Sequence, residues 1–254
     1  MVMNYEELMA VRCSELKELR KSPLHYKERV CNGSEDTTAL RLGRIFHTAI
    51  LEFDKWDERY AVAPAVDRRT KAGKEAYNLF LEQIEQEGKE AISAEERDQA
   101  QLMREAVLYD PYASRYLKEF RPEQIYCWTD PETGIACKMK ADAVTVVDGN
   151  VVLIDYKTTD SCAGNNFEYS VKKYGYQLQA GMYCEGYFAN SYTMPKFVFI
   201  AQEKKPPYAC RVYECDPYFI EQGRAEFHRL LQILKHCEEE DKWPGYYPTQ
   251  LLGE

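Results

Sequence analysis

The sequence lacks the hydrophobic segments that mark membrane and exported proteins. No run approaches the ~18 consecutive apolar residues of a membrane helix, and the best examples are only Val151–Ile154 and Phe197–Ala201. The first ten residues turn acidic at the sixth position, without the charged-then-apolar layout of a signal peptide. We therefore expect a cytoplasmic protein with no membrane association.

Repeats, low-complexity tracts and an excess of positive charge are also missing. The 13 Gly and 11 Pro among 254 residues exclude a collagen-like or linker-dominated chain. The nine cysteines include no CxxC pair, so we expect reduced thiols rather than disulfides or an iron–sulfur cluster. A net charge of -9 argues against a protein whose whole surface binds nucleic acid, although it permits a local basic channel.

What the sequence does contain is a helical first half. The whole sequence is 45% apolar, which suits a chain of this length that buries a sizeable core. Capping-box patterns begin at Asn4 and Ser93, and Asp67–Lys74 is a basic connection without a hydrophobic period. The pattern predicts helices over residues 4–20, 39–53, 74–87 and 93–109.

The second half alternates between strand-like and helical patterns. We predict strands over residues 124–129, 136–147, 151–157, 196–203 and 209–215, and helices over 165–174, 176–189 and 217–240. Asp216-Pro217 supplies an N-cap and a first-turn proline for the last helix. This order predicts one α/β domain over residues 1–254, with a mainly helical portion over 1–120 and a sheet-containing core over 121–254.

A predicted hairpin brings two carboxylates together. If Asp148-Gly149 is a two-residue turn, Val147 faces Asn150 and Asp142 comes to lie opposite Asp155. Lys157 then projects from the same face as Asp155. A three-residue turn would move Asp142 to the other face.

Paired carboxylates beside an apolar surface need a shared proton or a cation. Carboxylate oxygens suit Mg²⁺, and a metal held in this way serves phosphodiester hydrolysis, with the nearby lysine stabilising charge or positioning a water. The alternative is a solvated hairpin face on which Asp142 pairs with Lys140 or Lys157. Spacing alone leaves both interpretations open.

Three short segments carry a resemblance to a known nuclease superfamily. Lys138-Met-Lys-Ala-Asp142, Asp155-Tyr-Lys157 and Gln179-Ala-Gly-Met-Tyr183 resemble the PD-(D/E)xK motifs, in the branch with a trailing QxxxY motif. Further segments resemble the phage and prophage exonucleases related to exodeoxyribonuclease VIII. They are 40–47, 67–74, 128–134, 203–208 and 243–246.

The resemblance assigns roles to single residues. It implies a restriction-endonuclease-like core in which a mixed sheet is flanked by helices. It makes Asp142 and Asp155 metal ligands and Lys157 the catalytic lysine, with His47 completing the metal site. Glu123 is a further possible ligand, and Gln179 and Tyr183 support the site and contact DNA.

These positions also have plainer explanations. His47 lies on an apolar helix, where a lone histidine is ordinarily part of the core; Gly43, one turn earlier, leaves room beside its ring. Gln179 and Tyr183 form an ordinary i,i+4 pair, and Glu123 suits a surface position at the start of a strand. Two departures from the family pattern are Ala141 in place of proline and Asp155 in place of the commoner glutamate.

Basic clusters and tyrosines are candidates for DNA contact. Arg68, Arg69, Lys71 and Lys74 in the basic connection, and Lys172 and Lys173 before the second half's middle helix, are suited to backbone phosphates. Tyr174, Tyr176 and Tyr183 are suited to stacking on bases. All of these are equally consistent with an ordinary surface or core.

The resemblance also implies a function. It indicates a Mg²⁺-dependent exonuclease, with Mn²⁺ as a possible substitute, that degrades double-stranded DNA from 5′ ends and leaves 3′ overhangs for strand annealing. It further implies a homo-oligomeric ring, a single-strand annealing protein as partner, and a phage or prophage gene expressed in a bacterial cell. The alternatives are an endonuclease or flap-type repair nuclease, and a catalytically silent DNA-binding protein. A silent form should lose its charged site residues first, and this sequence keeps the whole set of site residues: Asp142, Asp155, Lys157, His47 and Gln179.

Overall fold

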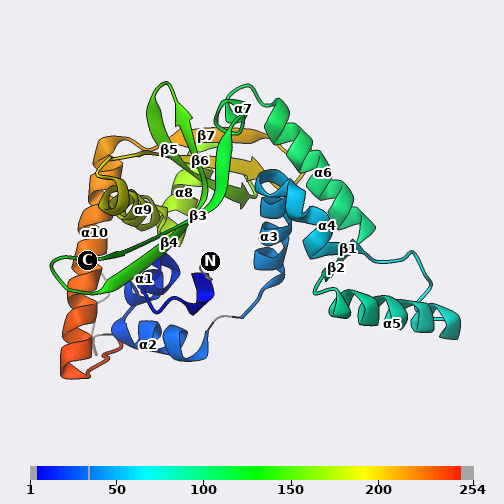
Figure 1. Cartoon of the computed structure of the whole chain (residues 1–254), viewed down its shortest axis with the longest axis horizontal. Helices are drawn as coiled ribbons and strands as arrows, with labels where there is room; N and C mark the ends of the chain where they lie inside the picture. Colours follow the sequence, from blue (N-terminus) through cyan, green and yellow to red (C-terminus); the bar gives the residue numbers. More distant parts are fainter. Residues whose placement is uncertain (1–4, 34, 247–254) are drawn as a thin grey trace, which may run out of the picture.

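A mixed five-stranded sheet forms the centre of the protein (Figure 1). The computed structural model describes residues 5–33 and 35–246. The strands run in the order β3-β4-β5-β6-β7, with β5 and β6 parallel and all other neighbours antiparallel. Their bounds are β3 Phe120–Thr129, β4 Ala136–Val147, β5 Asn150–Thr159, β6 Lys196–Glu203 and β7 Cys210–Glu214. This arrangement confirms the predicted restriction-endonuclease-like α/β fold.

Helices surround the sheet, and a short parallel strand pair lies outside it. The pair is β1 Tyr60–Val62 and β2 Glu90–Ile92. The helices are η1 Tyr5–Glu7, α1 Cys13–Leu19, α2 Pro23–Asn32, α3 Thr38–Leu51, η2 Phe53–Lys55, α4 Trp56–Arg59, α5 Lys71–Gln86, α6 Ala94–Tyr109, α7 Ala113–Tyr116, α8 Gly164–Tyr174, α9 Tyr176–Ser191 and α10 Pro217–Glu240. No helix within 5–33 and 35–246 combines the length and the apolar composition needed to cross a bilayer.

Three apolar clusters fix these elements in layers. On one face of the sheet, Phe46 of α3 and Met103 of α6 pack with Ile154 of β5. On the other face, Ala180 of α9 packs with Leu153 and Phe199. A third cluster joins α9 to α1 and α10. The helix that carries His47 and the helix that carries Gln179 therefore cover opposite faces of the sheet.

The β4–β5 turn confirms the register that the sequence predicts. Asp148 and Gly149 have φ values of 49° and 75°, and positive values at both central residues characterise the two-residue type I′ turn. Val147 pairs with Asn150, and the pairing continues to Ala143 and Ile154. The regular pairing ends there, one position before Asp142 and Asp155; the two carboxylates are still close enough for the charge of Asp142 to raise the pKa of Asp155.

The β3–β4 ladder is interrupted at Asp142, and the β4–β5 ladder ends just before it. On the β3 side, Pro122 pairs with Ala143 and Gln124 with Ala141, which leaves Glu123 opposite Asp142. Glu123 has a φ of 52°, a left-handed conformation that is costly for glutamate, and strained residues of this kind cluster at functional sites. Asp142 therefore has an acidic neighbour on each side, Glu123 on β3 and Asp155 on β5.

Several predicted helix boundaries are wrong. The helix predicted over residues 4–20 is replaced by the short helix η1 and by α1, which begins at Cys13, because Val11 between them forms a parallel bridge with Cys137; Asn4 lies outside the described residues. Helix α2 was not predicted, although Ser22 caps it and Pro23 occupies its first position. Helix α5 begins inside the predicted connection, because the Thr70 hydroxyl accepts a hydrogen bond from Gly73 N. The capping box at Ser93 and the N-cap at Asp216 are confirmed.

Helices α9 and α10 cross so closely that only glycine fits at the crossing. A Cβ on Gly181 would lie 2.2 Å from the Gly223 carbonyl carbon and 2.3 Å from Arg224 N. Because both are backbone atoms, neither can move aside without shifting the helix. The crossing matters for the site because Gln179 lies two residues before Gly181.

We expect Gly181→Ala to destabilise the protein by about 1–3 kcal/mol, because overpacking outweighs the gain in helix propensity. The melting temperature should fall by roughly 2–4 °C for each kcal/mol. Gly43→Ala is the matched control: nothing lies within 4 Å of its added Cβ, so its melting temperature should stay the same or rise. A Gly181→Ala protein as stable as the unmodified one would contradict the close crossing.

Candidate metal centre and cleft

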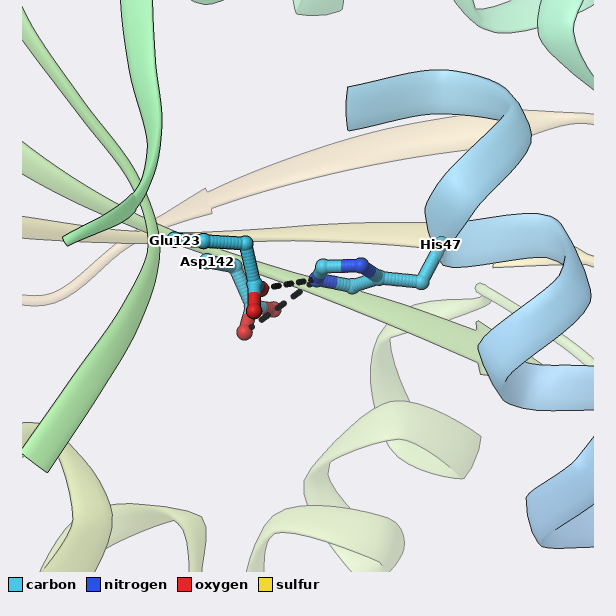
Figure 2. Close-up of side chains that lie close together, drawn as sticks. All are labelled: His47, Glu123 and Asp142. Carbon is cyan, nitrogen blue, oxygen red and sulfur yellow. Dashed lines mark ion pairs between the residues drawn. The ribbon is translucent and has the colours of Figure 1, made fainter. Parts of the chain in front are cut away.

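His47 and two carboxylates from different elements converge on one point (Figure 2). Helix α3 presents the His47 ring to the sheet, with Nε2 3.3 Å from Asp142 Oδ1 and 3.6 Å from Glu123 Oε1. One ligand atom from each of the three residues lies within 4.8 Å of the others. The structure thus brings together three of the four predicted metal ligands.

The donor set fits a divalent metal ion. Two carboxylates and one imidazole supply oxygen-rich ligation, and oxygen ligands suit hard cations such as Mg²⁺. Asp142 Oδ2 accepts a hydrogen bond of 2.9 Å from Tyr156 N, which fixes its carboxylate where the β4–β5 ladder ends. Glu123 is also ion-paired with Lys140, so a charge partner holds it at the site.

Asp155, the fourth predicted ligand, is bound to protein groups. Its side chain is 1% exposed, and its Oδ1 lies 2.5 Å from Lys157 Nζ. Gln179 Nε2 donates a hydrogen bond to Oδ2, whereas Oδ1 receives no hydrogen bond of regular geometry from the described residues. A buried carboxylate oxygen of this kind, beside the three converging ligands, fits a role in holding a cation. That role stays a prediction.

Burial and neighbouring charges shift the pKa of each ionisable group at the site. Burial raises the pKa of Asp155 to about 6, although the Lys157 ammonium opposes the shift. Burial would also raise the pKa of Asp142, but His47 and Lys157 hold it below its usual value. The pKa of His47 is raised because Asp142 and Glu123 outweigh the effect of burial.

Lys157 remains a cation in this setting. Burial alone would lower the pKa of its ammonium, but the carboxylates of Asp155 and Asp142 raise it above the usual value. The ammonium also lies 5.1 Å from the centre of the Tyr176 ring, a favourable cation–π distance. The site therefore keeps one positive charge directly beside its carboxylates.

Lys17 of α1 is a contact that the sequence did not indicate. Its Nζ donates a 3.1 Å hydrogen bond to Gln179 Oε1, which orients the carboxamide so that Nε2 points at Asp155. Burial lowers the pKa of this lysine. The only available signal was that Lys17 lies on the first predicted helix, and nothing in its spacing linked that helix to the site.

A cleft of about 1070 Å³ opens over the site. His47, Glu123, Asp142 and Lys157 form part of its wall. The remaining wall includes several further cations, of which the sequence analysis named only Lys140: Lys17, Arg44, Arg59, Lys140 and Lys204. Four of these cations are ion-paired with carboxylates, and the wall also contains acidic residues, so a local basic channel stays a prediction.

The basic clusters predicted to bind DNA lie outside this cleft. Arg68 and Arg69 precede α5, and Lys71 and Lys74 lie in its first turns, where the helix projects away from the sheet (Figure 1). Lys172 and Lys173 are exposed at the end of α8, closer to the cleft residue Tyr174. None of the six is among the cleft residues, and their contact with DNA stays a prediction.

The predicted tyrosines divide into two kinds. Tyr174 and Tyr176 line the cleft, as a stacking role requires. Tyr183 instead packs edge-on against Phe197, 6.2 Å between ring centres, within the apolar layer under the sheet. Tyr183 thus packs α9 against the sheet and is not among the cleft residues.

The fold and the site together define a nuclease domain of the PD-(D/E)xK type. The chain belongs to the family described as PDDEXK-like domain of unknown function (DUF3799), whose model matches residues 12–248. No curated protein matches the chain. The narrower resemblance to exodeoxyribonuclease VIII stays a prediction.

Two solved structures are similar to the chain. A candidate exonuclease from Eubacterium rectale has a TM-score of 0.66 and 15% identity, over 100% of this chain and 96% of that one. SSO0001 has a TM-score of 0.34 and 15% identity, over 91% and 79% of the two chains. At such low identity, the first match shows a shared fold alone, and the TM-score of the second is too low to show even that.

Proposed function

We propose that this protein is a Mg²⁺-dependent exonuclease that degrades double-stranded DNA from its ends. The observation that carries the proposal is the convergence of His47, Glu123 and Asp142 beside the Asp155–Lys157 pair in a cation-lined cleft. A divalent ion bound there would supply Lewis-acid stabilisation of a scissile phosphate and lower the pKa of a water molecule. His47, Glu123 and Asp142 would hold it, with Asp155 as a further ligand.

The protein's own residues orient the attacking water and stabilise the charge that develops in the reaction. Lys157, kept protonated by the neighbouring carboxylates, donates hydrogen bonds to the attacking water and offsets charge that develops on the phosphate. Gln179 holds the Asp155 carboxylate in place, and Lys17 holds Gln179. Because these groups are fixed before substrate binds, little reorganisation is needed during the reaction.

End-directed action is the finer part of the proposal. Its support is the cleft, whose cations suit backbone phosphates, and the exonuclease description of the similar Eubacterium rectale protein. The 5′-to-3′ direction, the 3′ overhangs for recombination, the ring of subunits and the single-strand annealing partner belong to the same proposal. They rest on the resemblance to the phage and prophage exonucleases.

Digestion of end-labelled linear duplex tests the proposal. With Mg²⁺, a 5′ label should be released first as mononucleotide while 3′-labelled strands shorten slowly, and EDTA should stop both reactions. Mn²⁺ should restore activity after EDTA treatment. Covalently closed circular DNA is the control and should stay intact.

Each contrary result has a distinct meaning. Cutting of the closed circle would replace the exonuclease with an endonuclease on the same core. Early release of the 3′ label would reverse the direction. An absence of hydrolysis with either metal would leave a DNA-binding protein without catalytic activity.

A further inference from the structure

A second, smaller cavity adjoins the catalytic cleft. It measures about 270 Å³ and shares Thr158, Tyr174, Tyr176 and Lys204 with the cleft wall. Strand β5 leads from one space to the other, because Thr158 and Thr159 directly follow Lys157. At the usual rise of a strand, two residues span about 7 Å, so the cavity lies within reach of a nucleotide next to the scissile phosphate.

Aromatic rings form one wall of this cavity. Tyr169 and Tyr174, on the last turns of α8, are 65% and 50% exposed. The Lys173 ammonium lies 5.8 Å and 5.2 Å from their ring centres, and the Tyr174 ring stacks on Tyr176 at 5.9 Å. Both rings therefore pack against neighbouring side chains and still keep a large exposed area.

Apart from the aromatic rings and Phe167, the lining is polar and carries no net charge. Thr159, Ser161 and Asn166 offer groups that can donate or accept hydrogen bonds. The two charged lining residues, Lys204 and Asp160, form an ion pair of 2.9 Å. A neutral ring fits this environment better than a phosphate, which would need an unpaired cation.

We propose that this cavity binds an unpaired nucleobase of the DNA strand at the catalytic site, with Tyr174 and Tyr169 as its stacking surface. The inference rests on the proposed action on DNA and adds a base-binding site to it. The cavity is smaller than pockets that enclose drug-sized ligands, so it suits one base and excludes a duplex. Stacking on a tyrosine ring favours no particular base, as digestion of DNA of any sequence requires.

Binding measurements on the full-length chain test this site. Fluorescence anisotropy gives the Kd for labelled duplexes with Ca²⁺ in place of Mg²⁺. Each duplex carries either an intact end or an abasic residue at one of the three terminal positions of one strand. Tyr174→Ala should weaken binding of intact ends roughly 5- to 100-fold, as expected for one lost stacking contact. At one of the three positions, an abasic residue should weaken binding to the unmodified protein by a similar factor. At that same position, the Tyr174→Ala protein should bind intact and abasic ends with equal Kd.

Two variants serve as controls. Tyr174→Phe keeps the ring and should therefore recover most of the affinity that Tyr174→Ala loses. Tyr109→Ala removes a tyrosine that is 86% exposed at the end of α6, away from both cavities, and should also be neutral. If Tyr174→Ala binds intact ends normally, or loses the same factor on intact and abasic ends, the base-binding site is refuted. If the unmodified protein neither binds nor cuts DNA, the proposed function itself fails.

Discussion

Lys157→Met should reduce Mg²⁺-dependent DNA hydrolysis by about 10²- to 10³-fold, the usual cost of removing one preorganised charge-stabilising donor. Methionine matches the length and apolar stem of lysine but cannot donate to water or phosphate. The effect should fall on kcat more than on KM, because the cleft keeps its other cations. Initial rates on linear duplex at several substrate concentrations separate the two parameters.

The control for this variant is Lys118→Met, which removes an exposed lysine outside the cleft. It should digest DNA at the unmodified rate. Because Lys157→Met leaves Asp155 buried without its cation, its melting temperature is measured in parallel. Lys157→Arg keeps the charge in a bulkier, planar form and should recover only part of the activity. Full hydrolysis by a folded Lys157→Met protein would remove this lysine from the mechanism.

The sequence predicted the part of the site that depends on local geometry. A two-residue turn fixes the register of β4 and β5, so the neighbourhood of Asp142 and Asp155 followed from counting residues. The placement of Lys157 beside Asp155 followed from strand alternation. The fold class could be predicted for the same reason, because strand patterns and helix caps depend on residues that are close together in the sequence.

Long-range placement could not be predicted from pattern alone. His47 reaches the sheet only because α3 packs across it, and residue similarity to a family was needed to single it out. Glu123 depends on an unusual backbone conformation in the middle of β3, where the sequence suggested a strand start. Lys17 depends on the bridge between Val11 and Cys137, which shortens the first helix and brings it against α9.

Asp142→Asn should reduce hydrolysis on the order of 10³-fold, because it weakens the hold on a divalent ion that is worth several kcal/mol of transition-state stabilisation. Asparagine has the same shape and can still accept the hydrogen bond from Tyr156 N, so the local fold should persist. Only the negative charge facing His47 is lost. Calorimetric titration with Mn²⁺ checks the cause directly, since the binding heat of the unmodified protein should weaken or vanish in the variant.

Asp148→Asn is the matched control because it makes the same substitution at the exposed turn of the same hairpin, where asparagine tolerates a positive φ. It should bind metal and digest DNA normally. The two readouts together locate the function of Asp142. Loss of hydrolysis with unchanged Mn²⁺ affinity would make Asp142 a group that positions substrate, and the metal would then have to depend on Glu123, His47 and Asp155. Normal hydrolysis by Asp142→Asn would show that the convergence of His47, Glu123 and Asp142 is not the catalytic centre.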